Sequence, residues 1–258
     1  MSDPDALRAV AFGDSEGRVW GAAIAAAAVP SGASAPAAGA RAAVAFGLGG
    51  GRARTATVEL VPDGRGWRLI GEGIGLQVEP AGEEGISDTG DGDGSPTGFQ
   101  ELCRVSGELA LPEGPRRIEC VGTRCLVDGL ERGSVSSVRA VSGWFGPDDA
   151  FMLLSLRGSG QRGQEADLVA ATLFDPEGWA PVAEPRLSTT YDGTGMPRRA
   201  NLEMWVGEGD NEFPRRAAAE AAGDAATIAT ELLNVRAVPL RCHSRGRDGA
   251  GVYVLASI

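Results

Sequence analysis

Short segments in which apolar and polar residues alternate recur along this chain, and they restrict its fold more than any other feature. In one of them Leu202, Met204 and Val206 alternate with Glu203 and Trp205. Successive side chains of a β-strand point to opposite faces, so this period of two predicts half-buried strands. Sequences rich in Gly, Pro and Asp separate the segments at the close spacing typical of sandwiches and barrels. The sequence therefore predicts a mainly β protein, an antiparallel barrel or sandwich, with at most one or two short helices.

Two alanine-rich stretches depart from this pattern. Glu16–Val29 and Arg215–Leu233 favour helix by intrinsic propensity, because alanine is the strongest helix former. Pro214 suits the first turn before the second stretch, whereas Gly223 interrupts it. We expect the helices, if they form, in these two places, and most readily over Arg215–Ala222.

A weak internal repeat indicates two related β units. The pattern Asp-x-x-Gly-Trp occurs at Asp63–Trp67 and again at Asp175–Trp179, each time after a predicted strand. We interpret each copy as a hairpin turn whose tryptophan caps one end of its unit. The predicted boundaries are 1–128 and 129–258. The first unit contains the acidic stretch Ala81–Gly98, which has almost no apolar side chain to bury and is expected to be a mobile loop.

Charge and cysteine content restrict the partners and the compartment. All 24 basic residues are Arg, and with 35 acidic residues the formal net charge is −11. This balance argues against nucleic acid or an anionic membrane as partner, because both require clustered cations. The longest small apolar run, Gly21–Pro30, is shorter than the ~20 residues that span a bilayer, so we expect no membrane insertion. The acidic N-terminus lacks the positive region of a signal peptide, and the four cysteines have no Cys-x-x-Cys spacing, so we expect reduced thiols in the cytoplasm.

Gly13-Asp14-Ser15-Glu16-Gly17 matches the Gly-x-Ser-x-Gly pattern of serine hydrolases and follows a short apolar run. It resembles the Gly-Asp-Ser opening of GDSL esterases, with the single histidine, His243, near the C-terminus as the base. Leu240 stands where those enzymes have their aspartate. A polar β-turn explains the same residues without any catalysis.

Other candidate site residues come from strands and strand ends. The catalytic candidates are carboxylates, a phenol and the imidazole that could move a proton: Glu203, Tyr191, Asp192 and His243. Large apolar side chains that could contact a ligand in a barrel are Trp144, Phe151, Trp179, Met204 and Trp205. With one histidine and unpaired cysteine spacings, we predict no metal site and no cofactor.

The C-terminal half resembles the lipocalin-like (calycin) double β-barrel proteins related to carotenoid hydratases. The resemblance rests on Val141–Gly146, Leu202–Trp205 and Gly249–Tyr253, and covers Arg139–Ile258. It implies two lipocalin-like units and a role in lipid, isoprenoid or secondary metabolism, and it assigns no catalytic residue.

Three functions follow as hypotheses. The first is binding of a hydrophobic small molecule such as a lipid, an isoprenoid or a secondary metabolite, with or without acid-catalysed hydration, cyclisation or isomerisation. The second is a GDSL-type serine hydrolase that uses Ser15 and His243, and the third is a non-catalytic β-sandwich interaction module. The sequence leaves open both catalysis and a homo-oligomer.

Overall fold

Nineteen strands and no helix make up the part of the chain that the computed structural model describes, which comprises residues 5–28, 40–48, 52–82, 85–86, 97–111, 114–130, 133–161, 167–206, 214–230 and 233–257. The strands of the first half are Asp5–Gly13 (β1), Val19–Ala28 (β2), Ala40–Leu48 (β3), Arg54–Asp63 (β4), Gly66–Gly71 (β5), Ile74–Pro80 (β6), Gly85–Ile86 (β7), Thr97–Leu111 (β8) and Gly114–Leu130 (β9). Those of the second half are Val135–Trp144 (β10), Ala150–Gly158 (β11), Leu168–Asp175 (β12), Gly178–Pro181 (β13), Glu184–Tyr191 (β14), Pro197–Trp205 (β15), Arg215–Ala221 (β16), Ala226–Ala229 (β17), Asn234–Ser244 (β18) and Arg247–Ser257 (β19).

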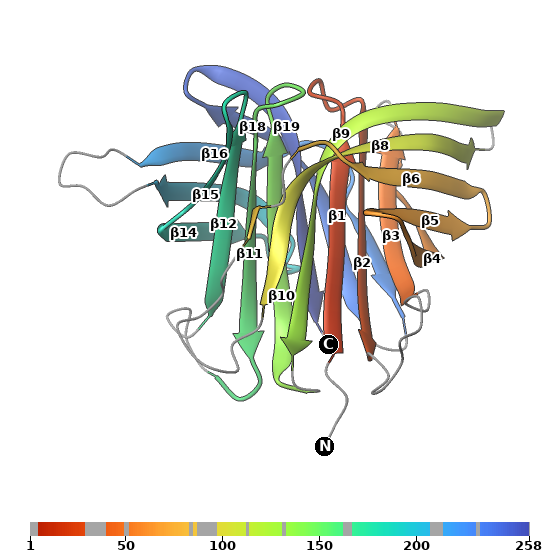
Figure 1. The fold of residues 1–258 in the computed structure, drawn as a ribbon, viewed down its shortest axis with the longest axis horizontal. Coiled ribbons are helices and arrows are strands. Elements are labelled where there is room, and N and C mark those ends of the chain that lie inside the picture. Colours follow the sequence, from red (N-terminus) through yellow and green to blue (C-terminus); the bar gives the residue numbers. More distant parts are fainter. Residues whose placement is uncertain are drawn as a thin grey trace.

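The strands form two antiparallel sheets, one from each half of the chain. In the first the order is β6-β5-β4-β3-β2-β1-β9-β8-β7, and β6 also pairs with β8, which closes eight strands into a barrel. In the second the order is β13-β12-β11-β10-β19-β18-β16-β15-β14, and this sheet curls without closing. Strands β14–β16 cross the direction of β10–β12 (Figure 1). The prediction of a mainly β protein with two barrel-like units is confirmed.

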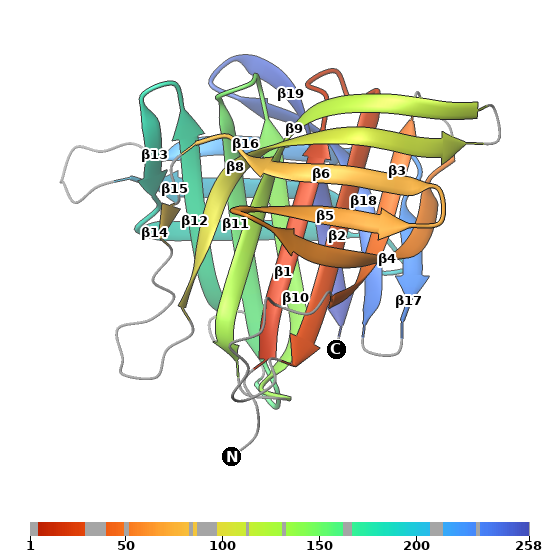
Figure 2. The ribbon, with the colours of Figure 1, turned by 45° about the vertical axis from the view of Figure 1, so that its right-hand side comes forward.

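The two units share a wall of strands that are buried on both faces. In β1, Val10 and Phe12 point into the barrel, while Leu7 and Ala9 pack against the second sheet. Strands β1 and β2 contact β19, and β9 contacts β10 and β11, so the barrel and the curled sheet lie side by side (Figure 2). The apolar faces predicted from alternation lie in the interiors of the two units: Val58, Leu60, Leu76 and Val78 in the barrel, and Leu202, Met204, Val238 and Leu240 in the second unit.

Neither alanine-rich stretch forms a helix among the described residues. Within Glu16–Val29 the chain makes a turn and then β2, and within Arg215–Leu233 it forms β16 and β17. In β16 burial alternates residue by residue, so that Ala217 and Ala219 face the core and Glu220 faces solvent. Ala22, Ala23 and Ala25 of β2 are buried because this strand lies in the shared wall. Tertiary burial therefore overrides the helix propensity of alanine.

The barrel interior holds one buried ion pair. Arg124 of β9 donates to the Glu101 carboxylate of β8 over 2.6 Å and to the backbone oxygen of Arg65 over 2.5 Å. The guanidinium carbon lies 4.7 Å from the ring centre of Trp67 and 5.1 Å from that of Phe99. One carboxylate and two aromatic faces thus compensate the charge, while the buried Nη1 of Arg124 has no hydrogen-bond partner among the described residues.

Both copies of the Asp-x-x-Gly-Trp pattern form hairpin turns. Asp63 pairs with Gly66 between β4 and β5, and Asp175 pairs with Gly178 between β12 and β13. The first tryptophan is buried in the barrel core, whereas Trp179 is partly buried and packs against the cluster between the units. The repeat therefore marks the same turn in both units but places its tryptophan in different surroundings.

Much of the predicted loop Ala81–Gly98 falls outside the described residues, namely 83–84 and 87–96. Within it, the two residues of β7 pair with Phe99 and Gln100 of β8. The unit boundaries 1–128 and 129–258 stay a prediction; the first sheet ends with β9 and the second begins with β10.

All four cysteines are free and buried. Burial raises the pKa of Cys125 and of Cys242 to about 12, so both are uncharged thiols at neutral pH. Cys242 is buried while its neighbour His243 is exposed, as expected for adjacent residues of one strand. In the described ranges no three His, Cys, Asp or Glu side chains come together as a metal site.

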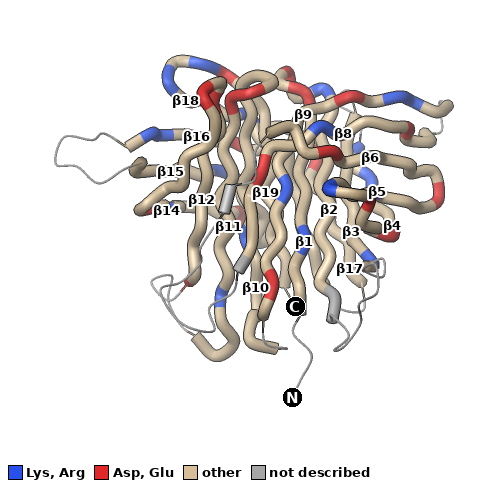
Figure 3. Tube along the Cα trace, in the orientation of Figure 1, with Lys and Arg blue, Asp and Glu red and all other residues tan. Residues whose placement is uncertain are grey.

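Charged residues gather in the hairpins and the outer strands, while the strands of the shared wall carry few of them (Figure 3). In the part of the chain described, no helix has the length and apolarity needed to cross a membrane.

One polar pair joins the two units inside the wall. The Thr123 hydroxyl of β9 donates to the Ser142 hydroxyl of β10 over 2.7 Å, and both side chains are buried. Thr123→Val leaves the Ser142 hydroxyl without this partner, so we expect the free energy of unfolding to fall by about 1–3 kcal/mol. The double variant with Ser142→Ala should recover part of this loss. Urea unfolding of the two single variants and the double variant measures the coupling; strictly additive losses would show that the hydrogen bond contributes nothing.

Candidate functional site

A cleft of about 310 Å³ lies at the junction of the two units. The barrel contributes Ala81, Gly82 and Leu102, and the second unit contributes Asp148 and the β12–β13 hairpin from Phe174 to Trp179. Leu102 and Phe174 are buried and form apolar surface, and Trp179 is partly buried beside them. Clefts of this size between units are common places for small ligands.

The local backbone fixes both sides of this cleft. The amide of Ala81 donates to the Leu102 oxygen over 2.9 Å, which holds the end of β6 against β8. On the other side the Asp175 carboxylate accepts the backbone N–H of Glu177 over 3.0 Å, an Asx-type turn that shapes the hairpin. Asp148, Asp175 and Glu177 are exposed, so carboxylates surround an apolar centre.

Gln100 connects the two sheets next to this cleft. Its side-chain nitrogen donates to the Ala170 oxygen of β12 over 3.3 Å, and its side chain lies on the same face of β8 as Leu102. The side-chain oxygen of Gln100 is buried and has no hydrogen-bond partner among the described residues.

The predicted ligand-binding residues lie in four different places. Phe151 and Met204 are fully buried in the core of the second unit. Trp144 is fully buried between the units, where its indole N–H donates to the backbone oxygen of Asp14 over 3.0 Å. Trp205 is partly buried and follows Met204 on the opposite face of β15. Among these five residues only Trp179 lines the junction cleft.

The GDSL-type arrangement finds no support in the structure. Ser15 is exposed in the hairpin turn between β1 and β2, where a nucleophile elbow requires a strand followed by a helix. The Nδ1 atom of His243 lies 2.8 Å from the Asp248 carboxylate and forms a hydrogen bond with it, and both residues lie on the exposed β18–β19 hairpin. No hydrogen bond joins Ser15 to His243 in the described part of the chain. The polar-turn interpretation of this motif is confirmed.

Glu203 and Asp192 make local contacts. Glu203 points away from the core of the second unit and accepts a hydrogen bond from Arg216 over 3.0 Å. The Asp192 carboxylate accepts from the hydroxyl and amide of Thr194 and from the amide of Met196, which lowers its pKa to about 2. Asp192 is therefore an anion that shapes the β14–β15 turn.

Tyr191, by contrast, belongs to a polar group inside the second unit. We call this group the Arg–Tyr cluster; its members come from β10, β11, the residue before β12, β14 and β19, and are Arg139, Ser155, Arg157, Asp167, Thr189, Tyr191 and Tyr253. The Tyr253 hydroxyl lies 3.1 Å from the Thr189 hydroxyl and 3.3 Å from that of Tyr191. These contacts connect β19 to β14 across the interior of the curled sheet.

Asp167 is the anion of the Arg–Tyr cluster. Its carboxylate accepts from Arg139, from the Arg157 Nε over 2.9 Å and from the Ser155 hydroxyl over 3.2 Å. Burial alone would raise the pKa of Asp167, but the Arg157 hydrogen bond and the charges of Arg139 and Arg157 outweigh burial and hold it below its usual value. No sequence pattern singled out Arg139, Arg157 or Asp167; the one signal was an arginine, Arg139, directly between the apolar residues Val138 and Ala140.

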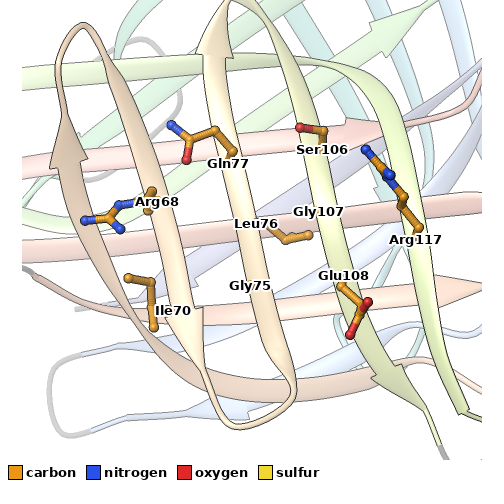
Figure 4. A pocket seen from close by; sticks show the side chains of 9 residues that line it. All are labelled: Arg68, Ile70, Gly75, Leu76, Gln77, Ser106, Gly107, Glu108 and Arg117. Carbon is orange, nitrogen blue, oxygen red and sulfur yellow. The ribbon is translucent and has the colours of Figure 1, made fainter.

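A second hollow, of about 510 Å³, lies on the outer surface of the barrel over β5, β6, β8 and β9 (Figure 4). Gly75 and Gly107 leave its floor without side chains, and Arg68, Ile70, Gln77, Ser106, Glu108 and Arg117 stand around it. Gly107 has a φ of 144°, in the region that favours glycine, and a Cβ there would lie 2.1 Å from the Gly75 oxygen. The groove thus results from a close approach of two strands, and it is open to solvent.

Solved structures show where this fold occurs. An AttH-like protein from Nitrosomonas europaea superposes with a TM-score of 0.65 at 14% sequence identity, covering 99% of this chain and 92% of that protein. CghA superposes with a TM-score of 0.66 at 12% identity, covering 99% and 88%. The structure of CghA with Sch210972 superposes with a TM-score of 0.65 at 12% identity, covering 99% of this chain and 89% of that protein. No protein-family model and no curated protein sequence matches the chain. At these sequence identities the comparisons show the fold, which is a double lipocalin-like architecture, and they do not show a function.

The buried carboxylate of Asp167 should make stability depend on pH. Asp167→Asn leaves two guanidinium groups facing a neutral amide, so we expect a loss of about 3–5 kcal/mol in the free energy of unfolding at pH 7. Because the pKa of Asp167 is lower in the folded state, its stabilisation is complete above the unfolded pKa of about 3.9 and is lost as the pH falls through the folded value.

Urea unfolding at pH 7 and at pH 3 measures this dependence, and the difference between wild type and variant should shrink at pH 3. Glu220→Gln is the matched control, since Glu220 pairs with Arg199 on the exposed face of the same unit. An equal loss for Asp167→Asn at both pH values would show that packing rather than charge is responsible.

Proposed function

We propose that this protein binds a hydrophobic small molecule in the junction cleft. The observation that carries the proposal is the apolar centre formed by Leu102, Phe174 and Trp179, which lies between two rigid sheets and is open to exposed carboxylates at its edge. Apolar surface orients and desolvates such a ligand, and the surrounding polar groups provide selectivity. The double lipocalin-like fold supports the proposal, since it places two curved sheets around the cleft.

The alternatives have weaker support. A non-catalytic interaction module requires no cleft of this kind, and a serine hydrolase requires a nucleophile elbow that the β1–β2 hairpin does not form. The groove on the barrel lies on the outer surface of one unit and is more open than the junction cleft, so it would leave more of a bound hydrophobic ligand in contact with water.

Titration with Nile red, an uncharged apolar dye, tests the binding site. We expect a Kd of about 1–10 µM for the wild type and a weakening of about tenfold or more in Trp179→Ala, because the variant removes an aromatic wall of the cleft. Trp179 is only partly buried, so the variant should stay folded, which circular dichroism checks.

Ile70→Ala is the matched control, since Ile70 is an exposed apolar residue of the barrel groove. Its Nile red affinity should equal that of the wild type. The proposal fails if Trp179→Ala binds the dye normally, or if Ile70→Ala is the variant that loses binding.

We extend the proposal to acid-catalysed hydration of an isoprenoid double bond, which the resemblance to carotenoid hydratase-like proteins implies. Asp148 is the carboxyl group of the cleft that comes from the β10–β11 connection, opposite the β12–β13 hairpin. Such a step requires the protonated form of the Asp148 carboxyl, which gives its proton to one alkene carbon; water adds to the resulting cation, and the water's proton returns to the carboxylate.

Incubation with an acyclic isoprenoid polyene, followed by mass spectrometry, tests this step. We expect a product heavier by one water with the wild type and none with Asp148→Asn, while Nile red binding is retained. Hydration that is unchanged in the variant would remove Asp148 from the reaction, and no hydration by the wild type would limit the function to binding.

A further inference from the structure

The Arg–Tyr cluster is separate from the junction cleft. Asp167 stands before β12 and Asp175 ends it, so at about 3.3 Å per residue the cluster lies roughly 25 Å from the cleft along that strand. A role for the cluster therefore does not depend on the proposed function of the cleft.

Among the described residues, the cluster has an excess of positive charge. Two guanidinium groups, Arg139 and Arg157, share the single carboxylate of Asp167. Arg139 donates from one terminal nitrogen, Nη2, to both Asp167 and Ser155. Its Nε and Nη1 make no hydrogen bond to any described residue. A purely structural role, in which Asp167 links neighbouring strands of the sheet, would explain the contacts of Asp167. It would leave these N–H donors of Arg139 unused.

Hydroxyl groups add neutral donors beside the two arginines. Burial raises the pKa of Tyr253, although the Thr189 hydrogen bond and the charge of Arg139 act in the opposite direction, so the phenol stays protonated at neutral pH. Tyr191 lies next to Arg157, whose pKa is raised by its hydrogen bond to Asp167 and, more weakly, by Tyr191 itself. An acceptor that enters this region therefore meets two cations and two phenols.

The cluster can be reached from solvent on one side. Tyr191 is 38% exposed and the Arg157 side chain is 33% exposed, whereas the side chains of Arg139 and Asp167 are 10% and 0% exposed. Val169, Leu187 and Leu255 are partly buried and pack on the core of the second unit. An apolar surface thus begins where the charged groups end.

We propose that the Arg–Tyr cluster binds the carboxylate of an amphipathic small molecule, whose apolar chain lies along Val169, Leu187 and Leu255. The Nε and Nη2 of Arg157 already donate to Asp167, so the ligand carboxylate accepts from the other terminal nitrogen of Arg157, Nη1, and from the Tyr191 hydroxyl. The carboxylate balances the second cation, which Asp167 alone leaves uncompensated.

Isothermal titration with decanoate, and with decanol as the uncharged equivalent, tests this proposal. We expect decanoate to bind the wild type at least about tenfold more tightly than decanol. Arg157→Gln should weaken decanoate binding by about tenfold or more, and Tyr191→Phe by about threefold or more, because each removes a donor. The matched control is Arg199→Gln, an exposed arginine of the same unit that pairs with Glu220. This control should bind decanoate within about twofold of the wild type.

Tyr191→Phe removes a single exposed hydroxyl and so decides the question if Arg157→Gln does not fold. The proposal is overturned if the wild type fails to bind decanoate, if decanol binds equally well, or if the folded variants keep the wild-type affinity. Trp179→Ala separates the two sites: decanoate affinity should be unchanged in this variant, and its loss would place the fatty acid in the junction cleft.

Discussion

The rest of the structure depends on a wall of strands that is buried on both faces. In β11, Phe151 and Leu153 point into the second unit while Met152 and Leu154 pack against the barrel, so no residue of this stretch reaches solvent. Small side chains in β2 let the sheets approach, and burial of both faces supplies the hydrophobic stabilisation that holds the two units together. Any polar group inside the wall must find a partner there, as Thr123 and Ser142 do.

This wall also explains what the sequence could and could not predict. Strands with one solvated face, such as β15, alternate in polarity, and their buried faces were predicted residue by residue. A strand buried on both faces loses the alternation, and when it consists of alanine, as β2 does, only the helix propensity remains visible. Phe151–Leu156 was recognisable as a covered strand because its large apolar side chains have no helical period.

The candidate sites were harder to predict because sheet pairing brings together residues that are far apart in the sequence. Trp179 could be found from the Asp-x-x-Gly-Trp repeat, but its cleft also needs Leu102, which the first unit contributes. Tyr191 was a candidate as a strand-end phenol, whereas Arg139 and Asp167 are polar residues whose meaning appears only once β10 and β12 lie on either side of β11. No local sequence pattern predicts that Arg139 and Asp167 come into contact.

The two units differ in how they neutralise the arginines inside them, and this difference bears on where ligands bind. In the closed barrel one arginine, Arg124, meets one carboxylate and lies over Trp67 and Phe99, so its charge is compensated within the packed interior. In the open sheet two arginines meet the single carboxylate of Asp167, and one of the two is partly exposed. A buried charge that meets one opposite charge needs no further counter-ion, whereas an unbalanced charge at an opening favours an external counter-charge. The open unit is therefore the better place for a charged ligand group, and the closed barrel is the rigid partner against which the junction cleft is built.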